Sequence, residues 1–511
     1  MSKKSISIIV IIAMLAVILC GCAEKGTEEI TEGNVISVSD ESVTYNGTEV
    51  GTEAAAVYVS NDVIYYEDRD TYDDGFAYGE GEDSDKHSAE EASACTVINI
   101  TEAGTYRICG KLSEGQIRVD LGEEAVTNPE AVVTLVLDNV DISCSVAPAV
   151  LFMNVYECDG EWSTETATSD VDTSAAGANI VIADSSINSI SGSHVAKIFK
   201  DNADEKKLWK QDAAFYSYMS MNIDGNDGVL NINGDNEGLD TELHLTVNGG
   251  VINITSRDDG INTNEDGVSV TTINGGTVHI LGGLGAEGDG IDSNGWLVIN
   301  GGTVIASANP ASDSGLDSDM GSYINGGTVI AFGSTMDWAE SDSKQVTVNL
   351  QFSEFKNADD AIVIKDEADG STVFSFNPEE DAVLSAHARQ YMGAIISCPE
   401  FETGSAYNVY VADVRQAHTG TDVKGGAPVG MEPPDAAQSQ MMPKPDDSGE
   451  APPEPPQGGM QGEPPEKPQD DHEPMPQGME PMDRPADAGE ASVSFLMQDK
   501  VNCFSGIRNA E

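Results

Sequence analysis

A short motif recurs four times in the middle of this chain of 511 residues, and it constrains the fold more than any other feature. The motif is Asn-Gly-Gly followed by Val or Thr and then by Ile or Val. Its copies begin at Asn248, Asn274, Asn300 and Asn325, which lie 26, 26 and 25 residues apart. A repeat of about 25 residues that holds short strand-like runs and turns, but no helical periodicity, is typical of one coil of a β-solenoid. We therefore predict an all-β parallel β-helix in which the glycine pair turns the chain at every coil.

A second motif alternates with the first, and it is acidic. Its pattern is an acid, Gly, Ile or Leu, Asp or Asn, Thr or Ser, and a last Glu, Asp or Asn. The four copies span residues 237–242, 259–264, 289–294 and 314–319, and the last copy begins with Ser in place of the acid. Since side chains alternate along a strand, the apolar third residue points into the stack and the fourth points outward. The predicted outward column is Asp240, Asn262, Asp292 and Asp317, with Glu237, Asp259 and Asp289 just before the glycines.

Such a column needs something to offset its charge. Neighbouring coils lie about 4.8 Å apart, and two carboxylates at that separation repel by about 3.5 kcal/mol at an effective dielectric of about 20. Ligands that are all oxygen, without His or Cys, favour a hard cation, so we predict that the column binds Ca²⁺. The alternative left open is a solvated acidic face in which Asp and Asn serve only the turns.

The overall charge excludes several partners. Lys and Arg number 25 against 88 Asp and Glu, for a net charge of −63. A field of that sign repels nucleic acid and anionic membranes and attracts cations. We therefore expect no nucleic-acid partner, and contact with a polyanion only where a cation bridges.

The N-terminus is predicted to be a targeting segment. Lys3 and Lys4 precede an apolar run over residues 6–19 that is short for a membrane span. The run ends in Leu-Cys-Gly-Cys, which resembles the processing box of bacterial lipoproteins and implies lipidation at Cys22. The alternative is an ordinary cleaved signal peptide, and either form places the mature chain outside the cytoplasm. Contact with the membrane is expected only through the lipid.

Composition divides the chain into five parts: a signal peptide (1–22), an acidic region with short strands and a linker (23–94), the parallel β-helix (95–413), a disordered segment (424–490) and a returning last strand (491–511). The segment 424–490 holds 16 of the 21 prolines and too few apolar residues to fold. Residues 156–178 are predicted to be a loop insertion. The Lys-rich residues 196–211 are predicted to be a second excursion, with a helix as one possibility.

Six further cysteines allow fifteen disulfide pairings, and the sequence does not choose among them. They are Cys95, Cys109, Cys144, Cys158, Cys398 and Cys503. Their spacing includes no CxxC pair, so no zinc site is predicted.

Several stretches together resemble a known family. They are SRDDGIN (256–262), GDGIDSNG (288–295), GLDSD (315–319) and INGGTVI (324–330). They are similar to the calcium-binding, right-handed parallel β-helix domain of carbohydrate-binding surface lipoproteins in bacteria, which is related in fold to pectate lyases. The resemblance implies several Ca²⁺ ions and adhesion to plant-type polysaccharides, including cellulose and acidic sugars. It makes metal ligands of Asp258, Asp259, Asn262, Asp289, Asp292, Asn294 and Asp317, and the stacking argument adds Glu237 and Asp240.

Three functions remain open: a glycan-binding protein, a polysaccharide lyase, and a structural adhesin without a specific glycan. A lyase needs a basic side chain near Ca²⁺ to remove a proton beside a uronate carboxylate. Arg257 is the one Arg, and there is no Lys, between residues 211 and 343. Arg257 is therefore a weak catalytic candidate and a candidate clamp for uronates, while the favoured alternative is an Arg paired with nearby carboxylates. Binding is thus favoured over catalysis. Trp296, Tyr323 and Trp338 are the aromatic candidates for stacking on sugars.

Overall fold

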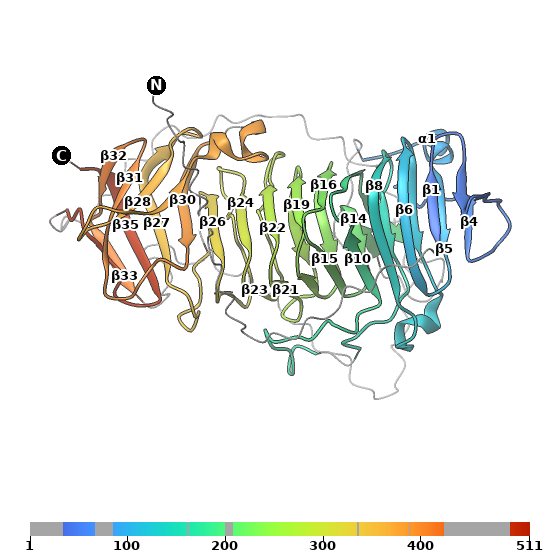
Figure 1. Cartoon of the computed structure of the whole chain (residues 1–511), viewed down its shortest axis with the longest axis horizontal. Coiled ribbons are helices and arrows are strands. Elements are labelled where there is room, and N and C mark those ends of the chain that lie inside the picture. The colour runs from blue at the N-terminus through green and yellow to red at the C-terminus, as the bar shows by residue number, and fades with distance from the viewer. Residues whose placement is uncertain are drawn as a thin grey trace, which may run out of the picture.

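The computed structural model describes residues 34–66, 85–160, 163–199, 208–334, 337–387, 389–423 and 491–510. The predicted signal peptide, Cys22 and the Pro-rich segment 424–490 lie outside these ranges. The described chain is nearly all β, with a single short α-helix, α1 (Ala89–Ala94), and the 3-10 turns η1 (Glu123–Thr127), η2 (Pro378–Glu380) and η3 (Leu384–His387). Within it, no helix is long and apolar enough to cross a membrane. The strands stack along one long axis, from β4 at one end to β35 at the other (Figure 1).

Three ladders of parallel strands form the stack. The first ladder contains β1 (Val35–Val38), β6 (Gly104–Leu112), β8 (Val133–Cys144), β10 (Ala178–Ile182), β15 (Met221–Gly225), β18 (Leu245–Val247), β21 (Val270–Ile273), β23 (Trp296–Ile299) and β25 (Gly321–Ile324). The second ladder contains the end of β8, β11 (Ile187–Gly192), β16 (Val229–Gly234), β19 (Val251–Thr255), β22 (Thr277–Leu281), β24 (Thr303–Ser307) and β26 (Thr328–Gly333). The third ladder contains β5 (Thr96–Ile100), β7 (Gly115–Val119), β9 (Val150–Phe152), β14 (Ala213–Ser217), β17 (Glu237–Thr241) and β20 (Ile261–Thr263).

The chain visits the three ladders in turn, so that one sequence repeat makes one coil. Strands β15, β16 and β17 belong to the first, second and third ladders, and β18 returns to the first. Equivalent apolar residues then lie opposite one another in adjacent coils: Ile254 pairs with Ile280, and both are fully buried. The predicted period of the repeat and the inward direction of its apolar residues therefore both appear in the structure.

The glycine pairs make the turns between the first and second ladders. The second glycine of each motif has a positive φ: 90° at Gly250, 81° at Gly276, 82° at Gly302 and 87° at Gly327. A Cβ on Gly302 would also lie 2.7 Å from the carbonyl oxygen of Gly276 in the previous coil. Both the backbone angle and the close approach exclude a larger residue, which explains why the motif repeats with the coil.

The range predicted for the parallel β-helix, residues 95–413, extends too far, because the three parallel ladders end at β26. The strands that follow are β27 (Thr347–Lys356), β28 (Ile362–Asp366), β29 (Thr372–Phe376), β30 (Tyr391–Ser397), β31 (Ala406–Val411), β32 (Val414–Ala417), β33 (Gly420–Val423), β34 (Phe495–Leu496) and β35 (Val501–Asn509). Most of their pairings are antiparallel, and β30 joins them to β26. No Asn-Gly-Gly motif follows Asn325, so the turn that sustains the coils is missing. The segment after the Pro-rich tract returns as β35, which pairs in parallel with β27.

The N-terminal region adds strands to the opposite end of the stack. It contributes β1, β2 (Val43–Tyr45), β3 (Thr48–Glu49) and β4 (Val57–Ser60). Strand β1 extends the first ladder through β6, and β4 pairs with β5. The helix α1 follows, with a capping box between Ser88 and Glu91.

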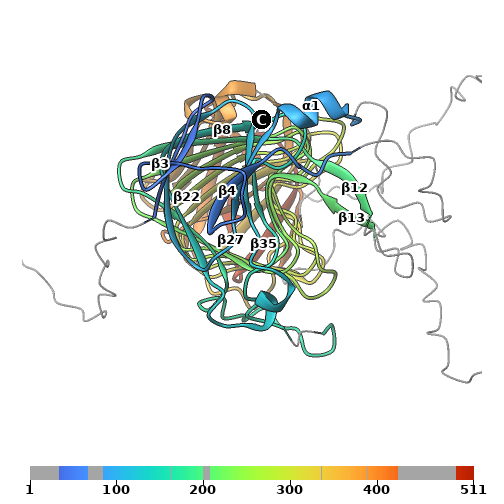
Figure 2. The same ribbon diagram turned by 90° about the vertical axis from the view of Figure 1, so that its right-hand side faces the viewer.

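The Lys-rich excursion is not helical. Its described residues form the antiparallel strands β12 (Val195–Phe199) and β13 (Leu208–Gln211), which project from the side of the stack (Figure 2). Val195, Ile198 and Trp209 are of types that favour strands, and this preference outweighs the lysines.

All six cysteines of the described residues are free thiols. Cys95 and Cys144 are both buried in the core, with their sulfur atoms 3.5 Å apart.

Candidate functional site

The acidic motifs align in one column on the third ladder. Asp240 lies opposite Asn262 in the pairing of β17 with β20. The next two copies continue the alignment through isolated parallel bridges from Ile261 to Ile291 and from Ile291 to Leu316. Asp292 and Asp317 follow those bridge residues directly in the sequence. The structure therefore brings these predicted residues together, and we refer to this set with its neighbouring acids as the acidic column.

The column, which the alternation of side chains points outward, is buried at its N-terminal end. Asp240 has no exposed surface, and Glu237 and Asn262 are only 4% and 6% exposed. The excursion through β12 and β13 brings the chain back to the stack at Asp212, and β14 then pairs with β17. Asp212 therefore lies against this end of the column, although the repeats themselves do not contain it.

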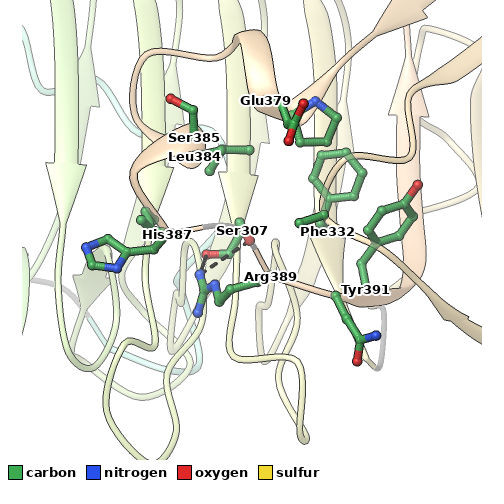
Figure 3. A pocket seen from close by; sticks show the side chains of 12 residues that line it. Ser307, Phe332, Glu379, Leu384, Ser385, His387, Arg389 and Tyr391 are labelled. Atoms are coloured by element: carbon green, nitrogen blue, oxygen red, sulfur yellow. Dashed lines mark hydrogen bonds between the residues drawn. The ribbon is translucent and has the colours of Figure 1, made fainter.

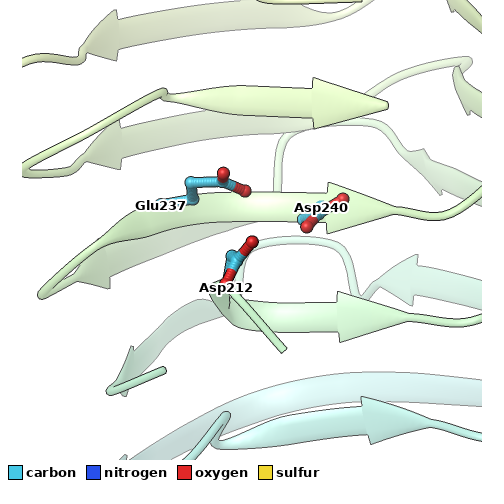
Figure 4. Close-up of side chains that lie close together, drawn as sticks. All are labelled: Asp212, Glu237 and Asp240. Atoms are coloured by element: carbon cyan, nitrogen blue, oxygen red, sulfur yellow. The ribbon is translucent and has the colours of Figure 1, made fainter. Parts of the chain in front are cut away.

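Three carboxyl groups meet in this buried part. Ligand oxygens of Asp212, Glu237 and Asp240 all lie within 4.8 Å of one another (Figure 4). Sequence reasoning missed Asp212, which precedes β14 and lies outside the four motifs. A signal was present in the sequence. Strand β14 pairs with β17 one coil later, and Asp212 is the acid that directly precedes β14. Lys210 was missed as well, and its ammonium group forms an ion pair with Asp212.

The amide side chains partner only part of this carboxylate group. Asn262 Nδ2 donates to Glu237 Oε1 at 3.2 Å. The second carboxylate oxygen of Glu237 and the amide oxygen of Asn262 are buried without a hydrogen-bond partner. Buried oxygens without partners are costly in free energy, so two acceptors here are left for a cation or another donor.

Further along the column, backbone amides partner the acids. The Asp289 N–H donates to Asp259 Oδ1 at 2.6 Å, and the Ser314 N–H donates to Asp289 Oδ1 at 2.6 Å. Asn294 turns its amide to Asp266 Oδ1 and to a backbone carbonyl, at 3.1 and 2.9 Å. These hydrogen bonds tie adjacent coils of the column to one another.

Burial is the largest cause that raises the pKa of the acids in the column, and repulsion from neighbouring acids is in most cases the second largest. The pKa rises to about 6 at Asp258, about 7 at Asp292 and, despite the hydrogen bond from Ser314, about 8 at Asp289. Burial also raises the pKa of Glu237, Asp240 and Asp259 well above the ordinary range, and the pKa of Asp317 in the same direction. Removing water from these groups favours their neutral form unless a positive charge is supplied.

The other predicted residues are scattered around the stack. Arg257 is exposed, and within the described ranges it forms no ion pair with a carboxylate. Tyr323 lines a groove on the first ladder, whereas Trp296 and Trp338 are half-buried and do not line it. Of the three aromatic candidates, Tyr323 is the one that lines this groove.

A pocket at the join between the stack and the C-terminal strands is too small for a sugar. Its volume is about 20 Å³, near the size that holds one water molecule (Figure 3). Arg389 lines it and donates to the carbonyl oxygens of Gly282, Gly283 and Ser307 at 2.6–3.1 Å. Burial lowers the pKa of Arg389 to about 10. This Arg is a clamp between β30 and the stack.

Comparisons with known proteins address glycan binding. A family model described as "Carbohydrate-binding domain-containing protein" matches residues 95–166 and 162–372, which is more than half of the chain. A search of curated proteins finds no match. A solved structure described as a polysaccharide lyase-like protein from C. thermocellum, in a gadolinium derivative, has 19% sequence identity. That match covers 60% of this chain and 93% of the other, with a TM-score of 0.35. By the extent of the family match, the chain belongs to the family of carbohydrate-binding domain-containing proteins.

Proposed function

We propose that this protein binds polysaccharide through a stack that is loaded with Ca²⁺ along the acidic column. Membership of the carbohydrate-binding family supports glycan binding in general. One observation carries the calcium part: Asp212, Glu237 and Asp240 are buried with their oxygens within 4.8 Å of one another. Lys210 is the only cation with an ion pair to this group among the described residues.

The chemistry of the donors fits Ca²⁺ better than other common metals. Ca²⁺ takes about six to eight oxygen ligands from carboxylates, amide carbonyls, backbone and water, in flexible geometry. The column offers carboxylates and amides, and the buried oxygens of Glu237 and Asn262 have no partner. Asp258, Asp259, Asp289, Asp292 and Asp317 would supply the later coils. A bound cation would return these groups to the ionised form that burial disfavours.

Calcium also gives an acidic protein a way to hold an acidic sugar. A net charge of −63 repels uronate carboxylates, and Ca²⁺ at an accessible part of the column would bridge the two. The proposal includes a right-handed parallel β-helix for the stack, in keeping with its three parallel ladders, and attachment to the cell surface through lipidated Cys22. Acidic and cellulosic glycans of plant type are the proposed partners.

Lyase activity is the second candidate, and it is favoured by the position of Lys210, a basic side chain paired with Asp212 at the proposed calcium site. Burial lowers the pKa of Lys210, but the charges of Asp212 and Glu237 outweigh burial and raise this pKa above its ordinary value. An ammonium group held protonated in this way is a poor general base. Binding without catalysis is therefore the stronger proposal, and ultraviolet absorbance from unsaturated uronates tests for the lyase.

The test of the proposal is binding of polygalacturonate, measured by titration calorimetry in Ca²⁺ and in EDTA. We expect binding in Ca²⁺, loss of binding in EDTA, and a large loss in the Asp292→Asn variant, which changes a half-buried carboxylate of the column. Glu124→Gln, which changes an exposed carboxylate at the far end of the stack, is the matched control and should bind as the parent does. Binding that is equal in EDTA and in Ca²⁺ would refute the calcium bridge.

A further inference from the structure

A polar groove runs along the first ladder, on a different ladder from the acidic column. Its volume is about 820 Å³. Its floor is a column of outward residues, one from each coil and in register: Asn179, Asn222, Thr246, Thr272, Val298 and Tyr323. The groove therefore crosses the strands and follows the long axis of the stack.

A row of amides forms one wall of the groove, two residues further along each strand. Asn274 Nδ2 donates to Asn248 Oδ1, Asn300 to Asn274, and Asn325 to Asn300, at 2.9–3.0 Å. These are the asparagines of the Asn-Gly-Gly motifs. Each bond uses one N–H of the donor amide, so every Nδ2 keeps a second hydrogen. Asn248, Asn274 and Asn300 are exposed, and the wall offers hydrogen-bond donors at the spacing of the coils.

The loop between β9 and β10 runs beneath the first ladder (Figure 1) and shows what chemistry the groove accepts. The hydroxyl of Thr173 lies 2.7 Å from Asn222 Oδ1 and 2.7 Å from Thr246 Oγ1. Asn222 Nδ2 donates in return to the carbonyl oxygen of Thr173 at 2.8 Å. A hydroxyl of the chain itself thus occupies the groove over β15 and β18. The column continues beyond it over β21, β23 and β25, through Thr272, Val298 and Tyr323.

The charges that line the groove favour a neutral ligand over an acidic one. Asp170, Asp172, Asp224 and Asp342 line it, with Lys344 as the one basic lining residue. An anionic sugar would meet repulsion here. A neutral glycan would find amides and hydroxyls for its own hydroxyl groups, and Tyr323 for the apolar face of a ring.

We propose that this groove binds a single extended strand of a neutral polysaccharide that lies parallel to the long axis of the stack. The inference rests on the proposed glycan-binding function and assigns it a second surface. Coils repeat at about 4.8 Å, and one pyranose unit of an extended 1,4-linked chain has a similar length. Successive sugars therefore meet equivalent groups on successive coils. Uronates bind at the calcium column, whereas neutral chains bind in the groove.

The test is titration of the full chain with soluble hexasaccharides of β-1,4-glucan, β-1,4-mannan and β-1,4-xylan, and with oligogalacturonate. Tyr323→Ala removes the stacking ring, and Thr272→Arg fills the floor of the groove. We expect each to weaken binding of the neutral chain by about tenfold or more, without changing oligogalacturonate binding. Tyr410→Ala, which changes a half-buried tyrosine beside Lys365 on the C-terminal strands, is the matched control and should bind as the parent does.

Several results would overturn the inference, and they differ from failure of the proposed function. Equal binding of the neutral chains by Tyr323→Ala, Thr272→Arg and parent would place their site elsewhere. Oligogalacturonate binding that Asp292→Asn abolishes, with no neutral chain bound, would support the calcium bridge and refute the groove. Absence of binding to every sugar would refute both. Equal melting temperatures of the variants and the parent show that any loss is not a loss of fold.

Discussion

The amide nitrogen of Asn264 lies 3.0 Å from each carboxylate oxygen of Asp240, one coil earlier in the stack. The neutral amide of Asn264 thus donates to the carboxyl group of Asp240, which has no exposed surface. An amide stabilises a buried charge less than a cation does. Without a bound cation, removing the carboxylate of Asp240 should therefore stabilise the protein. With a bound cation, the same change should cost some of the stability that the ion supplies.

We predict that Asp240→Asn stabilises the protein in EDTA at pH 8 by about 1–3 kcal/mol. The substitution removes a carboxyl group whose ionised form is disfavoured by burial and by the neighbouring acids, and it keeps an oxygen for Asn264. In Ca²⁺ the same variant should gain less stability from the ion than the parent gains. Chemical denaturation in both conditions measures the effect, with Glu124→Gln as the control. Destabilisation of Asp240→Asn in EDTA would show that the carboxylate is already well compensated.

The stability of the metal-free protein should fall as pH rises from about 4 to about 8. In the folded state burial raises the pKa to about 6 at Asp258, about 7 at Asp292 and about 8 at Asp289, whereas unfolded Asp titrates near 3.8. Between these values the unfolded chain binds fewer protons, so the free energy of unfolding decreases as pH increases. Melting temperatures in EDTA across this range provide the measurement. Ca²⁺ should flatten or reverse the trend, and a rising melting temperature in EDTA would contradict the account.

Gly302→Ala should destabilise the protein by about 2 kcal/mol or more. The residue has a φ of 82°, and a Cβ would lie 2.7 Å from the carbonyl oxygen of Gly276. Gly51 has open space around it and no positive φ, so Gly51→Ala should change stability by less than about 0.5 kcal/mol. Urea denaturation compares the two. Equal effects would mean that the turn tolerates a side chain and that the motif has another cause.

Arg389→Ala should lower the free energy of unfolding by about 2–4 kcal/mol, because it removes a half-buried side chain that donates to three carbonyl oxygens. The carbonyl oxygens of Gly283 and Ser307 keep a second donor, from Asn309 Nδ2 and the Gly282 N–H, whereas that of Gly282 loses the bond from Arg389. The loss should separate the melting of the C-terminal strands from that of the stack. Arg508→Ala, at an exposed position on β35, is the control and should have little effect. Calorimetry resolves one transition or two, and an unchanged single transition would show that Arg389 is not the clamp.

The repeats could be predicted because they carry strict local requirements. Only glycine fits the positive φ and the close approach at Gly276 and Gly302, so these turns are visible in the sequence as a fixed spacing. The alternation of apolar and polar residues then fixes which side chains stack. This is why the pairing of Asp240 with Asn262 follows from the motif alone.

The features that escaped prediction depend on segments outside the repeats. Asp212 and Lys210 reach the acidic column because an excursion outside the repeats returns there, and no periodic signal marks its path. Asp240 is buried beside Asp212, although the alternation alone points it outward. Thr173 enters the groove from a loop insertion for the same reason. The antiparallel strands after β26 carry no repeat, so their pairing could not be deduced from spacing.

The most direct test of the central claim is thermal unfolding of the chain from residue 23 in EDTA, in Ca²⁺ and in Mg²⁺. A ligand that binds only the folded state raises stability by mass action. The account predicts that Ca²⁺ at about 100 times its dissociation constant raises the melting temperature by about 5 °C or more over EDTA, and that Mg²⁺ has a much smaller effect. Equal melting temperatures in EDTA and Ca²⁺ would contradict it, because the acidic column would then be a set of protonated or solvated acids and not a calcium site.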